Sequence, residues 1–189
     1  MKCKTAVARS SIIIVGFPEP EIQFGRRMMK NNDYLKVAYS LFEEAYQLQM
    51  QGLLESAIEL YLQSIDAYPT AEAYTFLGWS YSFQGKLDQA IEECKKAIEI
   101  DPDFGNPYND IGAYLIQKKQ YEEAIPWLRK AAGAKRYQHY HYAHYNLARA
   151  YIALEQFNNA RREFENALKI APEYDIARDA LAVLKQRIQ

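Results

Sequence analysis

The stretch from Ala71 to Phe104, AEAYTFLGWSYSFQGKLDQAIEECKKAIEIDPDF, contains two amphipathic segments separated by a glycine and closed by an Asp-Pro pair. In the first segment, Tyr74, Leu77 and Tyr81 recur at positions i, i+3 and i+7, which is one stripe of an α-helix. In the second segment, apolar residues from Leu87 to Ile98 recur at the same spacings of three and four. The stretch therefore predicts two helices that bury their apolar stripes against each other.

Small and rigid residues mark where these two helices approach and where they end. Gly78 costs about 1 kcal/mol in a helix interior, so its presence indicates that the partner helix comes close there. Gly85 can adopt the left-handed conformation that often follows the last residue of a helix. Pro102 disfavours the helical region for Asp101 and closes the unit.

The same pattern recurs along the chain. Gly112 lies 34 residues after Gly78, and Pro69 lies 33 residues before Pro102. Two extra residues enter before the last copy, near the run Lys135-Arg136-Tyr137-Gln138. We expect an array with copies at residues 33–70, 71–104, 105–140 and 141–174.

The spacing Tyr74-x2-Leu77-Gly78-x2-Tyr81…Ala90-x3-Cys94…Pro102 resembles the tetratricopeptide repeat of about 34 residues. The third and fourth copies keep this spacing, and the first copy diverges from it, as terminal repeats tend to do. The resemblance covers about residues 34–174 and implies an all-α, right-handed α-solenoid of four helix pairs. It also implies that residues 175–189 form a capping helix.

Two helices of the array carry features of their own. Pro126 falls inside the second helix of the third copy, and a start near Glu122 would leave its missing amide in the unpaired first turn. The final helix is expected to bury one apolar side against the array, made of Ile176, Ala180, Val183, Leu184 and Ile188.

Residues 1–32 do not follow the repeat and are predicted to be a disordered leader. Their apolar run Ile12–Phe17 is shorter than that of a usual secretory signal, and no cleavage motif follows it. Met28 and Met29 leave open whether residues 1–28 belong to the mature protein. Two cysteines make no disulfide framework, so we expect a cytoplasmic location, with a secreted or periplasmic one through an atypical signal as the alternative.

Composition and motifs restrict the function. A net charge of −1 argues against nucleic acid or an anionic membrane as the main partner, and no apolar run is long enough to span a bilayer. No phosphate-binding loop, dinucleotide fingerprint or nucleophile motif is present, so neither an enzyme nor a cofactor is expected. His141 and His144 could share a helix face as metal ligands, but His144 simply occupies the position of Tyr74, and no metal site is predicted.

The resemblance implies that ligands bind on the concave wall, which the first helix of each pair builds. By position, the predicted binding residues are Tyr39, Phe42, Tyr46, Phe76, Trp79, Phe83, Asn109, Tyr145, Asn146 and Arg149. The same face also holds Met50, Thr75, Asn106, Asp110 and Tyr142. One end is thus aromatic and the other polar, which suits an extended or helical peptide whose backbone is held by Asn109 and Asn146.

Two functions remain open at this point. The first is a non-enzymatic scaffold that binds a peptide or partner protein in the groove. The alternative is a self-assembling protein, a possible homo-oligomer, whose groove is filled by its own leader or by a second protomer. Some tetratricopeptide proteins clamp chaperone C-termini with basic groove residues, and the corresponding positions here hold no lysine, which argues against that ligand.

Overall fold

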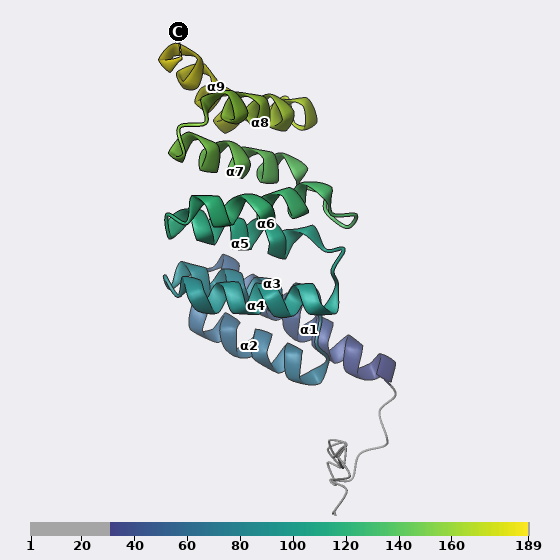
Figure 1. The fold of residues 1–189 in the computed structure, drawn as a ribbon. Helices are drawn as coiled ribbons and strands as arrows, with labels where there is room; N and C mark the ends of the chain where they lie inside the picture. The colour runs from purple at the N-terminus through teal and green to yellow at the C-terminus, as the bar shows by residue number, and fades with distance from the viewer. Residues whose placement is uncertain (1–30, 189) are drawn as a thin grey trace, which may run out of the picture.

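A computed structural model describes residues 31–188, which form nine α-helices and no β-strand (Figure 1). The helices are α1 (Asn31–Met50), α2 (Leu54–Ala67), α3 (Ala71–Phe83), α4 (Leu87–Ile100), α5 (Gly105–Gln117), α6 (Tyr121–Gly133), α7 (Tyr140–Ala153), α8 (Phe157–Ile170) and α9 (Asp175–Arg187). Consecutive helices form four pairs stacked in one row, with α9 against the last pair. The predicted all-α solenoid is confirmed. The predicted leader falls almost entirely outside the described residues, and α1 begins at Asn31, inside the range assigned to it.

Small residues set how closely the two helices of a pair approach. A Cβ added at Gly78 would lie 2.9 Å from the carbonyl oxygen of Ala90 and 3.2 Å from Sγ of Cys94, so α3 and α4 touch through their backbones there. Alanines lie fully buried at equivalent positions in all four pairs, among them Ala45, Ala57, Ala90, Ala124, Ala148 and Ala160. Gly85 has a φ of +73° in the turn between α3 and α4, as the sequence predicts.

A single apolar core runs from α4 to α9. Ile111, Leu128, Leu147 and Phe164 lie in it, each no more than 3% exposed. Each helix pair leaves an apolar face that the next pair covers, which is the arrangement that stabilises a solenoid. Burying a side chain such as Phe164 contributes about 1.5 to 3 kcal/mol.

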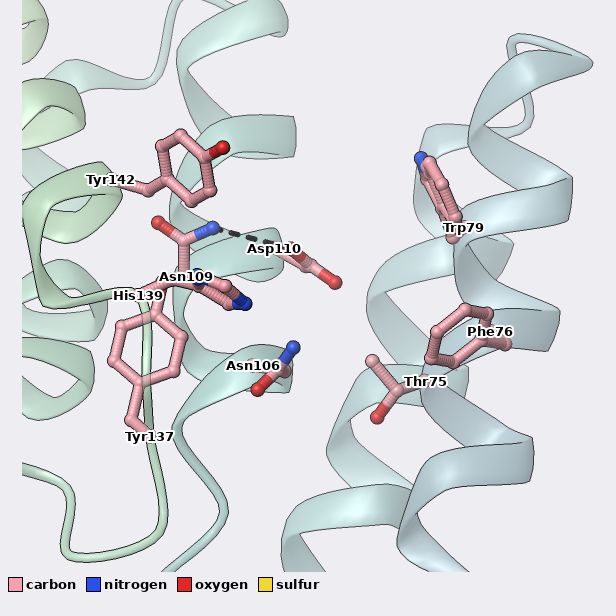
Figure 2. A pocket seen from close by; sticks show the side chains of 9 residues that line it. All are labelled: Thr75, Phe76, Trp79, Asn106, Asn109, Asp110, Tyr137, His139 and Tyr142. Carbon is pink, nitrogen blue, oxygen red and sulfur yellow. Dashed lines mark hydrogen bonds between the residues drawn. The ribbon is translucent and has the colours of Figure 1, made fainter. Parts of the chain in front are cut away.

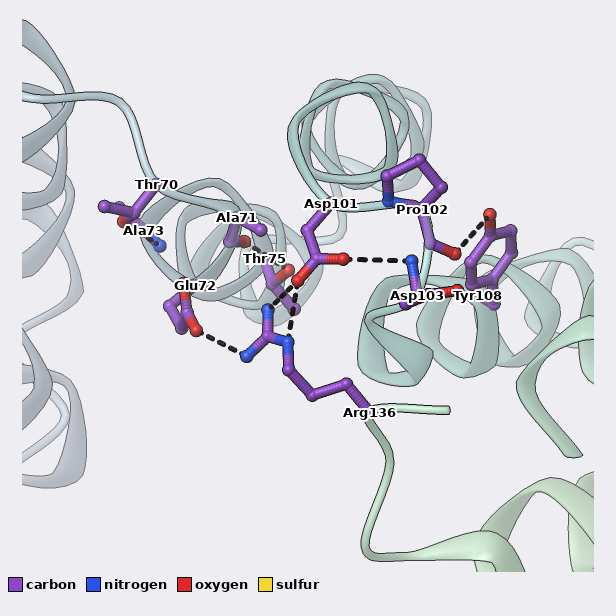
Figure 3. Close-up of polar contacts among 10 residues, drawn as sticks. All are labelled: Thr70, Ala71, Glu72, Ala73, Thr75, Asp101, Pro102, Asp103, Tyr108 and Arg136. Carbon is purple, nitrogen blue, oxygen red and sulfur yellow. Dashed lines mark hydrogen bonds and ion pairs between the residues drawn. The ribbon is translucent and has the colours of Figure 1, made fainter. Parts of the chain in front are cut away.

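The connection between α6 and α7 folds back along the array (Figure 3). Its backbone pairs with the earlier connection between α4 and α5: Gly105 N donates to Arg136 O at 3.0 Å, and Arg136 N donates to Asp103 O at 2.9 Å. The Arg136 side chain lies 2.7 Å from carboxylate oxygens of both Glu72 and Asp101. The residues inserted before the fourth copy therefore tie the connection after the third helix pair back to the second pair and to the start of α5.

One expectation about a single helix is wrong, and another is wrong in part. Helix α6 begins at Tyr121, so Pro126 lies in its second turn, beyond the unpaired first turn. Pro126 and Glu122 are both exposed, so water can reach the Glu122 carbonyl that would otherwise accept from residue 126.

In α9, Leu184 is buried and Ala180 and Ile188 pack against the core, as expected. Ile176 is 58% and Val183 66% exposed, however, and the other buried residues are Ala177 and Leu181. The spacing i, i+4 and i+7 of the buried residues also fits one helix stripe, and small Ala177 lets α9 approach α8 closely.

Candidate functional site

A hollow of about 300 Å³ lies on the concave wall between α3 and α5, beside the connection that leads into α7 (Figure 2). Three segments supply its lining: Thr75, Phe76 and Trp79 from α3, Asn106, Asn109 and Asp110 from α5, and Tyr137, His139 and Tyr142 from the connection and the start of α7. We call it the central hollow.

Aromatic rings form the α3 side of the central hollow and continue toward α1. The rings of Phe76 and Trp79 lie 5.6 Å apart in an edge-to-face arrangement. Phe42 and Tyr46 from α1 meet the ring of Phe76 at 5.1 and 5.6 Å, also edge to face. This geometry is favourable for aromatic pairs and holds the rings in place before a ligand arrives.

Amides form the opposite side. Asn146 Nδ2 donates to Asn109 Oδ1 at 3.0 Å, which connects α7 to α5. Arg149 Nη1 donates to Asn146 Oδ1 at 3.0 Å, and Asn109 Nδ2 donates to Asp110 Oδ1 at 3.3 Å. Asn146 is 7% exposed, so its side chain mainly contacts the other members of this hydrogen-bonded network and not solvent.

Among residues 31–188, Asp110 is the one carboxylate that lines the central hollow. Burial raises the pKa of Asp110 to about 7, although the hydrogen bond from Asn109 acts in the opposite direction. Within residues 31–188, no lysine, arginine or histidine forms an ion pair with it. The carboxyl group therefore carries only part of its negative charge at neutral pH.

A second hollow of about 410 Å³ lies toward the N-terminal end of the array. Its lining is mostly apolar and comprises Gln49, Met50, Gly52, Leu54, Trp79 and Phe83. Met50 and Phe83 are 58% and 57% exposed, which is high for large apolar side chains. Trp79 borders both hollows, so they are neighbouring parts of one concave face.

The predicted binding residues separate into groups. Phe76, Trp79 and Asn109 line the central hollow, and Phe83 lines the second. Phe42 and Tyr46 pack behind Phe76, while Asn146 and Arg149 join the polar side through hydrogen bonds without lining either hollow.

The remaining two predicted residues lie elsewhere. Tyr145 packs against Phe164 at 5.8 Å and Tyr174 at 5.4 Å and lines neither hollow. Tyr39 is exposed on α1 and lines neither hollow. Sequence reasoning missed Tyr137 and His139, because they belong to the connection and not to a first helix. The extra residues before the fourth copy were the signal that could have indicated them.

The histidines take part in structural contacts. His144 Nδ1 lies 2.7 Å from Glu163 Oε2; burial opposes ionisation of Glu163, but hydrogen bonds from His144 and Asn166 lower the pKa of its carboxyl overall. Burial and the nearby His139 lower the pKa of His141. In the described part of the chain, no three metal-ligating side chains come together, and none of the helices there is long and apolar enough to cross a bilayer.

Helix pairs stacked in register around a concave face define a helical-repeat protein of the solenoid class. Models of the tetratricopeptide repeat match residues 71–104, 141–174 and 93–125. The chain is therefore a tetratricopeptide-repeat protein.

Curated relatives share parts of this array. Protein bimA of Emericella nidulans is 32% identical over 101 residues, covering 53% of this chain and 12% of that protein. The SGT1 homolog of Oryza sativa subsp. japonica is 38% identical over 71 residues, covering 37% and 19%. Hsp70-Hsp90 organizing protein 1 of Glycine max is 26% identical over 113 residues, covering 58% and 20%. The chain thus spans a fifth or less of each of these proteins.

Solved structures share its fold. Pseudomonas aeruginosa pilF matches with a TM-score of 0.77 and 22% identity, covering 82% of this chain and 71% of that one. MamA matches with a TM-score of 0.65 and 23% identity, covering 75% and 82%. The first TPR of Spaghetti (RPAP3), bound to the HSP90 peptide SRMEEVD, matches with a TM-score of 0.59 and 24% identity, covering 63% and 93%.

Proposed function

We propose that this chain is a non-enzymatic adaptor that binds an extended or helical segment of a partner protein on its concave face. The observation that carries the proposal is the central hollow, with the rings of Phe76 and Trp79 on one side and the amides of Asn106 and Asn109 on the other. Aromatic rings can bury apolar side chains of such a segment, while amides can bond its backbone.

A related fold supports a peptide ligand in particular. The first TPR of Spaghetti (RPAP3) is bound to the peptide SRMEEVD, in which three of seven residues are acidic. Within the described residues, the central hollow is lined by Asp110 and by no lysine or arginine, so we do not propose an acidic ligand for this chain.

Selection from a randomised peptide display library against the full chain tests the proposal. We expect selected peptides to lose affinity about tenfold or more with Trp79→Ala, because a buried aromatic anchor is typically worth 2 kcal/mol or more. Leu62→Ala is the control, since it removes an exposed apolar side chain on α2 outside both hollows. No selected peptides, or equal binding by the Trp79→Ala variant, would contradict the proposal.

A second candidate function is self-assembly, which the exposed Met50 and Phe83 in the second hollow favour. In this case the apolar face is covered by the chain's own leader, whose residues Ile12–Phe17 are apolar, or by a second protomer. Sedimentation velocity on the full chain and on a chain beginning at Met29 distinguishes self-assembly from the binding of a separate partner. A change of oligomeric state between them, abolished by Phe83→Ser, would support self-assembly.

A further inference from the structure

In the central hollow, a carboxylate lies across the cavity from aromatic rings. Figure 2 shows the Asp110 carboxylate pointing from α5 into the space that Phe76 and Trp79 of α3 face from the other side. Tyr137 and Tyr142 add two more rings to the lining. An apolar ligand alone would leave this carboxylate without a partner, and an acidic ligand would repel it.

In the described part of the chain, no cationic side chain pairs with Asp110. Its one hydrogen bond inside the described chain comes from the neutral amide of Asn109 at 3.3 Å. Arg149 is connected to it only through the amides of Asn146 and Asn109.

The other titratable groups around Asp110 come from its own helix, from α4, from the α6–α7 connection and from α7. Its charge acts on Cys94 of α4, on Tyr114 of its own helix and on Tyr137 of the connection. His139 and Tyr142 complete the titratable lining of the hollow. Of the residues that the structure describes, no lysine or arginine lines the hollow.

We propose that the central hollow binds a lysine or arginine side chain of the partner segment, with its cationic group against the Asp110 carboxylate and the rings of Phe76 and Trp79. The inference rests on the proposed peptide-binding function and adds the chemistry of the ligand. A cation over an aromatic face is attracted by the ring quadrupole, and an ionised hydrogen bond to a carboxylate is about twice as strong as a neutral one.

Proton linkage gives the proposal a signature that a purely structural aspartate would lack. Burial raises the pKa of Asp110 to about 7, so the carboxylate is a minor species at pH 6 and the major one at pH 8. Because only the ionised form pairs with the cation, the affinity should rise about tenfold between these pH values. A His139→Gln background removes the imidazole from the lining, so that a pH effect in this background is assigned to Asp110.

Two pools of nonapeptides test the inference on the full chain. Both are N-acetylated and C-amidated, with uncharged residues randomised around a central position that holds arginine in one pool and the isosteric, neutral citrulline in the other. A third pool, with lysine at that position, measures how much an ammonium group contributes to the affinity. We expect the arginine pool to bind about tenfold more tightly than the citrulline pool, and Asp110→Asn to abolish both this difference and the rise with pH.

Asp66→Asn is the matched control, because it changes the net charge equally at an exposed site on α2. It should leave the preference for the basic pools intact. Equal binding of basic and citrulline pools would overturn the inference and leave the proposed function standing. Binding of no pool, while display-selected peptides still bind through Trp79, would also overturn the inference alone. Loss of both kinds of binding would overturn the proposed function with it.

Discussion

Asp110 lies where a carboxyl group does not favour folding. It is partly buried in the central hollow, and burial raises its pKa to about 7 from an ordinary value near 3.8. At a pH between these two pKa values, the folded chain keeps a proton on Asp110 that the unfolded chain releases. The stability of the fold should therefore fall as the pH rises through this range.

Asp110→Asn should consequently stabilise the protein at high pH. Raising the pKa from 3.8 to about 7 corresponds to a loss of about 4 kcal/mol in the free energy of unfolding when the carboxyl is ionised. Partial exposure to solvent reduces this loss to about 1 to 2 kcal/mol. The gain should be present at pH 8 and nearly absent at pH 4, where the unfolded carboxyl is itself half protonated. Urea unfolding at the two pH values measures it, and an equal effect at both would refute the sign of the argument.

Arg136 illustrates a different kind of residue, one that tightens the array without entering the groove (Figure 3). Its guanidinium bridges Glu72 and Asp101 and lies 4.0 Å from the centre of the Phe104 ring. These partners come from α3 and from the connection after α4. One side chain thus joins elements that are far apart in the sequence.

Arg136→Ala should lower the free energy of unfolding by about 1 to 2 kcal/mol, as the sum of two partly exposed ion pairs and one cation–π contact. Arg136→Lys should recover less than half of the loss, because an ammonium cannot present the same planar fork. Chemical denaturation measures both. Lys135→Ala, which removes one exposed ion pair to Asp103, should stay within about 0.5 kcal/mol.

At the scale of elements, the helix pair depends on close backbone approach. A Cβ at Gly112 would lie 2.4 Å from Cγ and Cδ2 of Leu128, a side chain that is fully buried in α6. Helix α5 therefore has no room for a side chain at this position. The spacing of 34 residues between Gly78 and Gly112 reflects the same requirement in two successive pairs.

Gly112→Ala should destabilise the protein by about 1 to 3 kcal/mol, because overpacking outweighs the better helix propensity of alanine. Gly133→Ala is the control within the same pair: no atom lies within 4 Å of the added Cβ, so the change should be neutral or slightly stabilising. Thermal and urea unfolding of the two variants compare them. A stable Gly112→Ala variant would show that the two helices can separate at little cost.

At the scale of the whole molecule, the stability of each helix pair depends on its contacts with the neighbouring pairs. Each pair contacts mainly its neighbours, so a local defect should weaken the adjacent pairs more than distant ones. Phe164 lies at 0% exposure in α8, within the core that α4 to α9 share, which makes it a sensitive position.

Phe164→Ala should cost about 3 to 5 kcal/mol through lost burial and the cavity left behind. Amide hydrogen exchange should speed up most in α7 to α9 and least in α1 and α2, because coupling in a solenoid runs between neighbours. Phe83→Ala, at 57% exposure, should stay within about 0.5 kcal/mol. Uniform loss of protection along the array would mean that it unfolds as a single unit.

The central hollow shows how far sequence reasoning reaches. Repeat spacing placed Phe76, Trp79 and Asn109 on the concave face, because residues one period apart occupy equivalent helix positions. It did not place Tyr137 and His139 there, since nothing in the period specifies how inserted residues fold back. It also treated Asn146 as open to ligand, whereas that side chain bonds Asn109 across 37 residues.

By itself, the sequence determined the period, the helix pairs and the division of the concave face into aromatic and polar parts. These follow from local spacing, because a helix repeats every 3.6 residues and a glycine or alanine marks each close approach. Only the tertiary structure decided which face α9 buries, where the α6–α7 connection lies and that Asp110 faces Trp79 across the hollow, with no lysine or arginine from residues 31–188 in the lining. Such contacts depend on the rotation and rise from one pair to the next, and spacing along the chain does not specify either.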